Sequence, residues 1–285
     1  MHTDAGAGDQ SVGEFRVRLR SARPLLTEYV LSQQRSPDVE RARLKLLEEY
    51  HDPLSAGQLN AIGVSEGWRC LDVGAGGGSV TRMLAERVGS TGSVLAVDLD
   101  TGLLEGLASN RVEVRRHDLM ADQLPQDEFD LVHARLLLMF LSPRLGALER
   151  LVAAARPGGW VASLAPDFTT VAVSPTSLAW QRVWSRFLDA AMAGGWDPGY
   201  GARLCGDLHA AGLVDVHADY IARCYPGGSL PARLLSLTIE RLRDQMVLLG
   251  ADNDEIDAAR LLLEDPANAY RGPTSCVAWG KRPRS

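Results

Sequence analysis

A glycine-rich stretch carries the strongest chemical signal in the chain. It reads LDVGAGGGS over residues 71–79 and lies between an apolar run and a helical pattern. Glycine lets the backbone turn sharply and approach a ligand because it has no Cβ, and free N–H groups at a helix start favour a carboxylate or phosphate. Asp98 ends the next apolar run, where a carboxylate can accept both hydroxyls of a ribose. The stretch therefore predicts a site for a nucleoside-like ligand.

The order of the glycines separates two kinds of ligand. A dinucleotide fingerprint has the form GxGxxG, and here Ser79 stands where the last glycine should be. The observed order is DxGxGxG, beginning at Asp72. A nicotinamide-dependent oxidoreductase is therefore the weaker alternative, and a glycine-rich turn without a ligand remains a third.

Short apolar runs alternate with helical patterns around this stretch. Strands are predicted at 69–73, 94–97, 112–114, 129–132 and 160–164, and helical patterns cover 80–88, 101–109 and 143–156. Such alternation is typical of a parallel sheet with helices on both faces.

The remainder of the chain divides by composition. We expect a disordered tail over 1–14, an N-terminal helical lid over 15–64, with a helix start at Ser36–Pro37, and a core over 65–167. Residues 168–285 complete the sheet and add a helical cap. Their predicted elements are helices at 176–193 and 199–211, strands at 213–222 and 274–279, and cap insertions near 176–195 and 230–265.

Five short segments together resemble the motifs of class I S-adenosylmethionine-dependent methyltransferases of the ubiquinone/menaquinone-methyltransferase-like group. They are residues 72–78, 97–100 (VDLD), 117–119 (HDL), 129–133 (FDLVH) and 156–159 (RPGG). The whole chain is also similar to actinobacterial small-molecule methyltransferases with a helical cap. The resemblance implies an α/β, Rossmann-like, seven-stranded sheet of order 3-2-1-4-5-7-6 with its last strand antiparallel.

The resemblance also implies a cofactor site for S-adenosyl-L-methionine, with S-adenosyl-L-homocysteine as product. Gly74, Ala75 and Gly76 would hold the methionine part, and Asp98 the ribose. Leu99 and Leu119 would pack on the adenine, and Asp118 would meet its amino group. Asp118 as a solvated turn residue and Leu119 as ordinary core are the alternatives. The further residues expected at the cofactor are Asp72, His133 and Tyr29.

The acceptor site should lie above the carboxyl ends of the strands. His133, near the end of the fourth strand, is the candidate base or polar anchor, and the alternative is a histidine that hydrogen-bonds the backbone. Arg135 could anchor an acidic acceptor or pair with a nearby acid. Asp167, just past the fifth strand, and His51, from the lid, are further candidates for the pocket.

Aromatic residues in the cap could wall this pocket. Trp180 and Trp184 share one helical face with Phe187, and Trp196 and Tyr200 lie in the loop that follows. A helix that packs its aromatic face on the sheet is an equal alternative. If the aromatic side chains do line the pocket, they indicate an apolar or aromatic acceptor.

Composition excludes several classes of function. The net charge of −6 and pI near 5.6 do not suit a nucleic-acid substrate, and 133–135 lack the sequence typical of nucleic-acid amino-methylating enzymes. The four cysteines show no metal-binding spacing, so we expect no metal. We find no apolar run of membrane length and no secretory leader.

We therefore expect a cytoplasmic enzyme of secondary metabolism, monomeric or homodimeric, with a small-molecule acceptor and no membrane partner. It would transfer a methyl group to O, N or C by in-line displacement. The alternative on the same fold is an enzyme that binds the cofactor for other chemistry.

Overall fold

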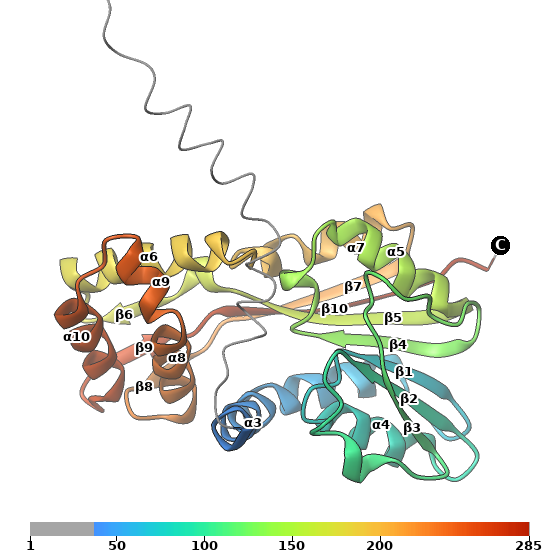
Figure 1. Cartoon of the computed structure of the whole chain (residues 1–285). Coiled ribbons are helices and arrows are strands. Elements are labelled where there is room, and N and C mark those ends of the chain that lie inside the picture. Colours follow the sequence, from blue (N-terminus) through green and yellow to red (C-terminus); the bar gives the residue numbers. More distant parts are fainter. Residues whose placement is uncertain (1–36, 285) are drawn as a thin grey trace, which may run out of the picture.

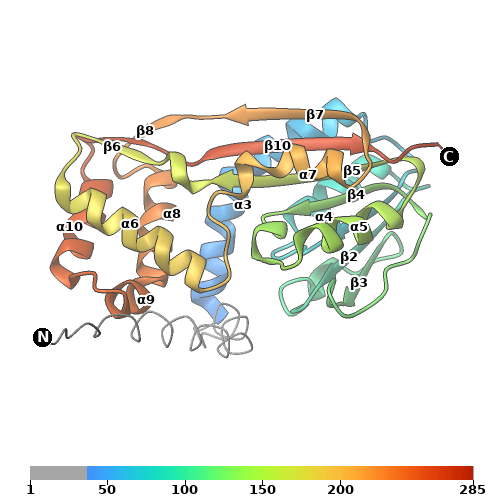
Figure 2. The same ribbon diagram turned by 90° about the horizontal axis from the view of Figure 1, so that it is seen from above.

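The structure of the protein is a computed structural model, and it describes residues 37–284 (Figure 1). The predicted tail over 1–14, the first part of the lid and Tyr29 lie outside the described residues. Within them the chain forms a large α/β lobe and a smaller helical cap, and one long helix runs between the two (Figure 2).

The large lobe is built on a seven-stranded sheet. Its strands, in chain order, are β1 (Arg69–Val73), β2 (Ser93–Asp98), β3 (Val112–Arg116), β4 (Phe129–Arg135), β5 (Ala155–Asp167), β7 (Val214–Ile221) and β10 (Thr274–Lys281). They lie in the order β3-β2-β1-β4-β5-β10-β7. The first five are parallel, and β10 is antiparallel to both β5 and β7. The predicted order, with an antiparallel last strand, is confirmed.

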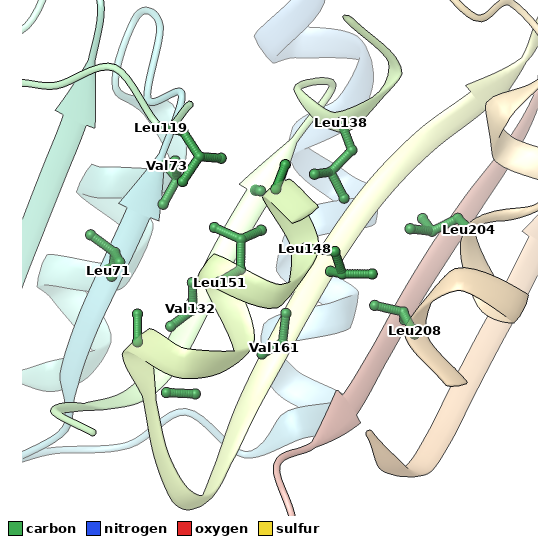
Figure 3. Close-up of a cluster of buried hydrophobic side chains, with 14 of the residues drawn as sticks. Leu71, Val73, Leu119, Val132, Leu138, Leu148, Leu151, Val161, Leu204 and Leu208 are labelled. Atoms are coloured by element: carbon green, nitrogen blue, oxygen red, sulfur yellow. The ribbon is translucent and has the colours of Figure 1, made fainter. Parts of the chain in front are cut away.

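Helices cover both faces of this sheet because the central strands are apolar on both sides. On one face lie α3 (Pro37–Ile62) and α4 (Ser79–Val88). On the other lie α5 (Arg144–Ala154) and α7 (Leu204–Ala210), whose leucines Leu148, Leu151, Leu204 and Leu208 pack on Val132 and Val161 (Figure 3). Alternate strand residues therefore point to the α3–α4 face, and these include Asp72, His133 and Arg135.

The cap has its own hydrophobic core. Its elements are α6 (Leu178–Ala193), α8 (Leu230–Arg241), α9 (Arg243–Leu248), α10 (Asn253–Glu264) and a small sheet of β6 (Ala172–Ser174), β9 (Ala269–Arg271) and β8 (Cys224–Pro226). The side chain of Asp252 caps α10 by accepting the N–H groups of Asp254 and Glu255. The small sheet was not predicted, because strands of three residues show no periodicity.

Some segments differ from the prediction. Residues 101–109 hold only the 3-10 turn η1 (Glu105–Leu107), because the side chains of Asp98 and Asp100 accept the N–H groups of Asp100 and Gly102 and compete with a helix. The predicted helix at 199–211 divides into η4 (Tyr200–Ala202) and α7. Two further turns follow β4 and β5, namely η2 (Leu138–Phe140) and η3 (Phe168–Thr170). Across residues 37–284 no helix is both long and apolar enough to cross a membrane.

Candidate cofactor and acceptor site

The glycine loop between β1 and α4 curls over the carboxyl end of β2. Gly74, Gly76 and Gly78 have φ angles of 71°, 57° and 80°, in the left-handed region that favours glycine. The N–H groups of Gly74 and Ala75 donate to the carbonyl of Val97, at 2.8 and 3.2 Å. A Cβ on Gly76 would meet nothing within 4 Å, so the surface of the loop is open there. This geometry suits a ligand that lies against the backbone.

Asp98 joins the loop to the end of β2. Its Oδ2 accepts the N–H of Gly76 at 2.8 Å, and its Oδ1 accepts the N–H of Asp100 at 3.1 Å. Burial raises the pKa of this carboxyl, and the backbone hydrogen bonds oppose that shift. The next side chain, Leu99, is 42% exposed. A carboxylate and an exposed apolar side chain therefore stand side by side next to the open loop.

Asp72 and His133 lie beneath this loop, on the α3–α4 face of the sheet. Asp72 accepts hydrogen bonds from Thr81 Oγ1 at 2.7 Å and from His133 Nδ1 at 3.2 Å. The His133 side chain is completely buried, and its Nε2 has no partner among the described residues. The structure thus places His133 inside the packed layer, held by Asp72. Its expected contact with cofactor or acceptor stays a prediction.

The segment after β3 folds onto itself. Asp118 Oδ1 accepts the N–H of Met120 at 2.8 Å, and the Asp118 N–H donates to Asp122 Oδ2 at 2.9 Å. Leu119 is buried in the main core cluster. Neighbouring His117 is buried too, which lowers the pKa of its ring. Asp118 is therefore part of a turn and Leu119 is a core residue, which agrees with the alternatives, and the roles of Asp118 and Leu119 at an adenine stay predictions.

Arg135, the last residue of β4, is paired with α3. Its guanidinium donates to Asp52 Oδ1 at 2.7 Å, Ser55 Oγ at 3.3 Å and Ser79 Oγ at 2.8 Å. Ser79 Oγ in turn donates to Asp52 Oδ1 at 2.7 Å. The arginine therefore pairs with an acid, as the alternative reading of the sequence allowed, and it ties three elements together.

Glu48 strengthens the same junction. One of its carboxylate oxygens accepts the Ser79 N–H at 3.2 Å, where the first turn of α4 has free donors. Negative charge is favoured at a helix start. Glu48, Asp52 and Ser55 were all missed by the sequence reasoning, because nothing local indicates which residues α3 would meet.

His51 and Asp167 lie near the carboxyl edge of the sheet. His51 is 3% exposed, and its Nδ1 lies 2.9 Å from the carbonyl oxygen of Leu47. Burial, with the charge of Arg135 as a second cause, lowers the pKa of His51 to about 4. Asp167 caps η3 by accepting hydrogen bonds from the N–H and the hydroxyl of Thr169, at 2.9 and 2.5 Å.

The predicted aromatic wall is a buried aromatic cluster. Trp180 stacks on Trp184 with ring centroids 5.5 Å apart, and Trp184 stacks on Phe187 at 4.5 Å. Trp196 continues the cluster at 5.7 Å from Phe187. Val173, Leu235, Ile239 and Met246 of the cap pack with it. The contacts of the cluster are those of a hydrophobic core within the cap. The alternative of a packing helix had expected the large sheet as the partner, and the partner is the cap itself. Tyr200 is fully buried in the main core cluster instead.

Comparisons with known proteins bear on the core segment. A family described as "Methyltransferase domain" matches residues 70–159. The aklanonic acid methyltransferase DauC of Streptomyces sp. (strain C5) is 31% identical over 127 residues, 42% of this chain and 58% of that protein. The nocamycin O-methyltransferase of Saccharothrix syringae is 26% identical over 260 residues, 80% of this chain and 89% of that protein. The chain spans about half the length of the first curated relatives that it matches.

A solved structure shares the fold. Phosphoethanolamine N-methyltransferase 2 of Haemonchus contortus, in complex with S-adenosylhomocysteine and phosphomonomethylethanolamine, superposes with a TM-score of 0.52 at 18% identity. The match covers 81% of this chain and 52% of that one. The Rossmann-like fold predicted from the sequence is therefore confirmed.

Proposed function

Because residues 70–159 match a methyltransferase domain on the class I fold, we propose that this protein is an enzyme that transfers a methyl group from S-adenosylmethionine to a small organic acceptor. The observation that carries the proposal is the Asp98 carboxylate hydrogen-bonded to Gly76 in an open, left-handed glycine loop. A carboxylate at the end of the second strand can accept the hydroxyls of a ribose, and backbone at a helix start next to it suits the carboxylate of an amino-acid moiety.

The residues present fit this cofactor. Space is open over Gly76, where a Cβ would meet no atom within 4 Å. Asp98 would hold the ribose, Leu99 would pack on the adenine, and Gly74, Ala75 and Gly76 would hold the methionine part. Asp118 and Leu119 would border the adenine from the segment after β3. Asp72 and His133 would support the loop from below, since the two side chains are buried and bonded to each other.

The chain's own residues then have two tasks. S-adenosylmethionine supplies an electrophilic methyl group on a positively charged sulfur. The glycine loop and Asp98 fix the orientation of that group, and α3 covers the edge of the sheet and excludes water. Alignment of acceptor and methyl group is the main requirement of an in-line displacement. Arg135 and Ser79 hold α3 against the loop through Asp52.

We place the acceptor between α3, the carboxyl ends of β4 and β5, and the cap, where His51, Arg135 and Asp167 lie. A small apolar or aromatic metabolite is the acceptor class, and secondary metabolism is the setting. The relatives named aklanonic acid methyltransferase and nocamycin O-methyltransferase support this assignment. A cytoplasmic location, a monomeric or homodimeric state and the absence of a nucleic-acid partner stay predictions.

Calorimetry with S-adenosylhomocysteine and, separately, with NAD tests the cofactor assignment. We expect S-adenosylhomocysteine to bind and NAD not to bind. Asp98→Ala should weaken that binding strongly, whereas Asp189→Ala, an exposed acid on α6, should not change it. Undiminished binding by Asp98→Ala would show that the site is wrongly placed. Release of S-adenosylhomocysteine only when an acceptor is present would separate methyl transfer from other chemistry on the same fold.

A further inference from the structure

One face of α3 carries three buried polar residues toward the sheet. They are His51, Ser55 and Gln58, at a spacing that puts them on one side of a helix. Gln58 Nε2 donates to the carbonyl groups of Ser163 in β5 and Ala278 in β10, at 3.1 and 3.0 Å. Ser55 contacts Arg135, the last residue of β4. His51 lies one turn of α3 from Ser55, on the side away from Gln58, and therefore stands beyond the carboxyl end of β4. The helix itself runs between the two lobes (Figure 2).

The hydrogen bond to Leu47 fixes the tautomer of His51. A carbonyl oxygen can only accept, so Nδ1 at 2.9 Å from it carries the proton. The other nitrogen, Nε2, then has a lone pair that can accept a hydrogen bond. This Nε2 is buried and has no partner in the part of the chain that the structure describes. Buried polar atoms nearly always have partners, so an unpartnered lone pair at a ligand-binding edge indicates a missing hydrogen-bond donor.

The charges around His51 select the kind of donor. Arg135 lies close enough to lower the pKa of the ring, after burial itself, while the Leu47 carbonyl and Asp52 oppose the shift. The ring is therefore neutral near pH 7. A protonated ammonium group has no free lone pair and so could not accept a methyl group. A carbon acid would offer no strong hydrogen bond to Nε2. A hydroxyl group has a lone pair that can accept the methyl group, and it can donate a strong hydrogen bond to Nε2.

One tyrosine ring packs on the histidine, and two further tyrosine rings continue from it. The edge of the Tyr50 ring packs on His51 with centroids 4.6 Å apart. The Tyr50 hydroxyl lies 3.5 Å from that of Tyr225 in β8, and Tyr225 packs near Tyr270 in β9 at 6.1 Å. A Cβ on Gly272 would come within 3.3 Å of the hydroxyls of Tyr50 and Tyr270, so the glycine lets the backbone pass close to these rings. Aromatic surfaces of this kind favour a flat ring.

We propose that His51 Nε2 accepts the hydrogen bond of a hydroxyl group on a ring-shaped acceptor and takes its proton, so that the enzyme is an O-methyltransferase. This inference rests on the methyltransferase function proposed above. The acceptor oxygen uses a lone pair to form the new C–O bond while the C–S bond breaks and its electron pair stays on sulfur. The O–H proton passes to Nε2 and then to water. The oxygen becomes strongly acidic as it gains the methyl group, so a weakly basic imidazole is sufficient.

Two matched probes test the inference without knowledge of the natural acceptor. 4-Methylphenol and 4-methylanisole have the same ring, and only the first has a hydroxyl hydrogen. We expect the protein saturated with S-adenosylhomocysteine to bind the phenol about tenfold more tightly, the value of one hydrogen bond of about 1.4 kcal/mol. His51→Asn keeps a donor for Leu47 but does not reach the Nε2 position, so it should bind the two probes within about twofold of each other.

Three comparisons complete the design. His51→Gln places an amide oxygen near the Nε2 position and should restore part of the preference. His209→Asn, on the exposed face of α7, should leave it unchanged. In the wild-type protein, the ¹⁵N resonance of His51 Nε2 should shift when 4-methylphenol is added. This NMR measurement does not depend on whether the variants fold.

The outcomes separate the two proposals. Failure of the wild-type protein to bind S-adenosylhomocysteine would overturn the proposed function. Normal binding of S-adenosylhomocysteine, together with an unchanged phenol preference in His51→Asn, would overturn only the inference about His51. Failure of both rings to bind at millimolar concentration, or an Nε2 resonance that does not respond to the phenol, would also overturn it.

Discussion

The junction of Asp52, Arg135 and Ser79 should couple α3 to the glycine loop by a measurable free energy. Asp52 Oδ1 receives two hydrogen bonds of 2.7 Å, from Arg135 and from Ser79. The Arg135 side chain is 11% exposed and that of Asp52 34%, so the pair is partly screened by water. Exposed pairs contribute about 0.2–1 kcal/mol, and hydrogen bonds to charged groups about 1.5–3 kcal/mol. We therefore expect a coupling of about 1 kcal/mol.

Urea unfolding of Asp52→Asn, Arg135→Gln and the double variant measures this coupling. Asp52→Asn should lower the free energy of unfolding by about 2 kcal/mol, because it leaves the more buried charge without its acid. Arg135→Gln should cost about 1 kcal/mol, since Asp52 keeps its bond to Ser79. The exposed pair Arg186–Asp189, at 3.1 Å on α6, is the matched control and should show less than about 0.5 kcal/mol. If the losses at Asp52 and Arg135 simply add within about 0.3 kcal/mol, the reasoning is refuted.

Three further predictions concern the loop, the pH dependence of stability and the cap. Gly76→Ala should lower the free energy of unfolding by about 1–2 kcal/mol, the cost of a non-glycine residue in the left-handed region. Gly78→Ala should lower it more, because its Cβ would also collide with Leu107, and thermal unfolding should rank the two variants in that order. The pKa of His51 is lowered from 6.5 to about 4, so between these pH values the ring is protonated in the unfolded chain and neutral in the folded protein. The free energy of unfolding should therefore fall as the pH falls from about 6.5 to about 4. In that pH range His51→Asn should show a shallower fall than the wild type, and an equally steep fall would contradict the assignment. Trp184→Ala should lower the free energy of unfolding by about 3–5 kcal/mol, as expected of a core tryptophan; a loss under about 1 kcal/mol with weakened acceptor binding would instead favour a pocket wall.

The glycine loop and the strand ends of the candidate cofactor site were predictable because their signals are local. The strand, the glycine loop and the start of α4 follow one another within about twenty residues, and Asp98 ends the next strand. The backbone of the loop has left-handed φ angles that favour glycine, so the glycines in the sequence indicate where the turn lies. The continuous apolar runs of the central strands likewise predicted the parallel sheet, and the resemblance to class I methyltransferases implied its strand order.

The junction with α3 was not predictable for the opposite reason. Arg135 and Asp52 are 83 positions apart, and neither residue differs in sequence context from an ordinary surface charge. His133 was expected to face the edge of the sheet because it follows an apolar strand. The alternation of side chains along β4 directs it to the α3–α4 face, where Asp72 binds it, and its contact with cofactor or acceptor stays a prediction. A strand that is buried on both faces has no polar–apolar alternation in its sequence, so the sequence does not indicate to which face each side chain points.

Similarity within the core segment likewise does not identify the acceptor, because most of the residues expected to contact the acceptor lie outside that segment. The family match covers 70–159, which holds the loop and Asp98 but neither α3 nor the cap. An alignment confined to that segment carries no information about His51, Tyr225 or Tyr270. The nocamycin O-methyltransferase aligns over 260 residues and so extends into the elements that would contact an acceptor. Tyr50 packs on His51, Tyr225 of β8 packs on Tyr50, and Tyr270 of β9 packs on Tyr225. Acceptor choice should therefore change with substitutions in α3, β8 and β9 while affinity for the methyl donor stays constant.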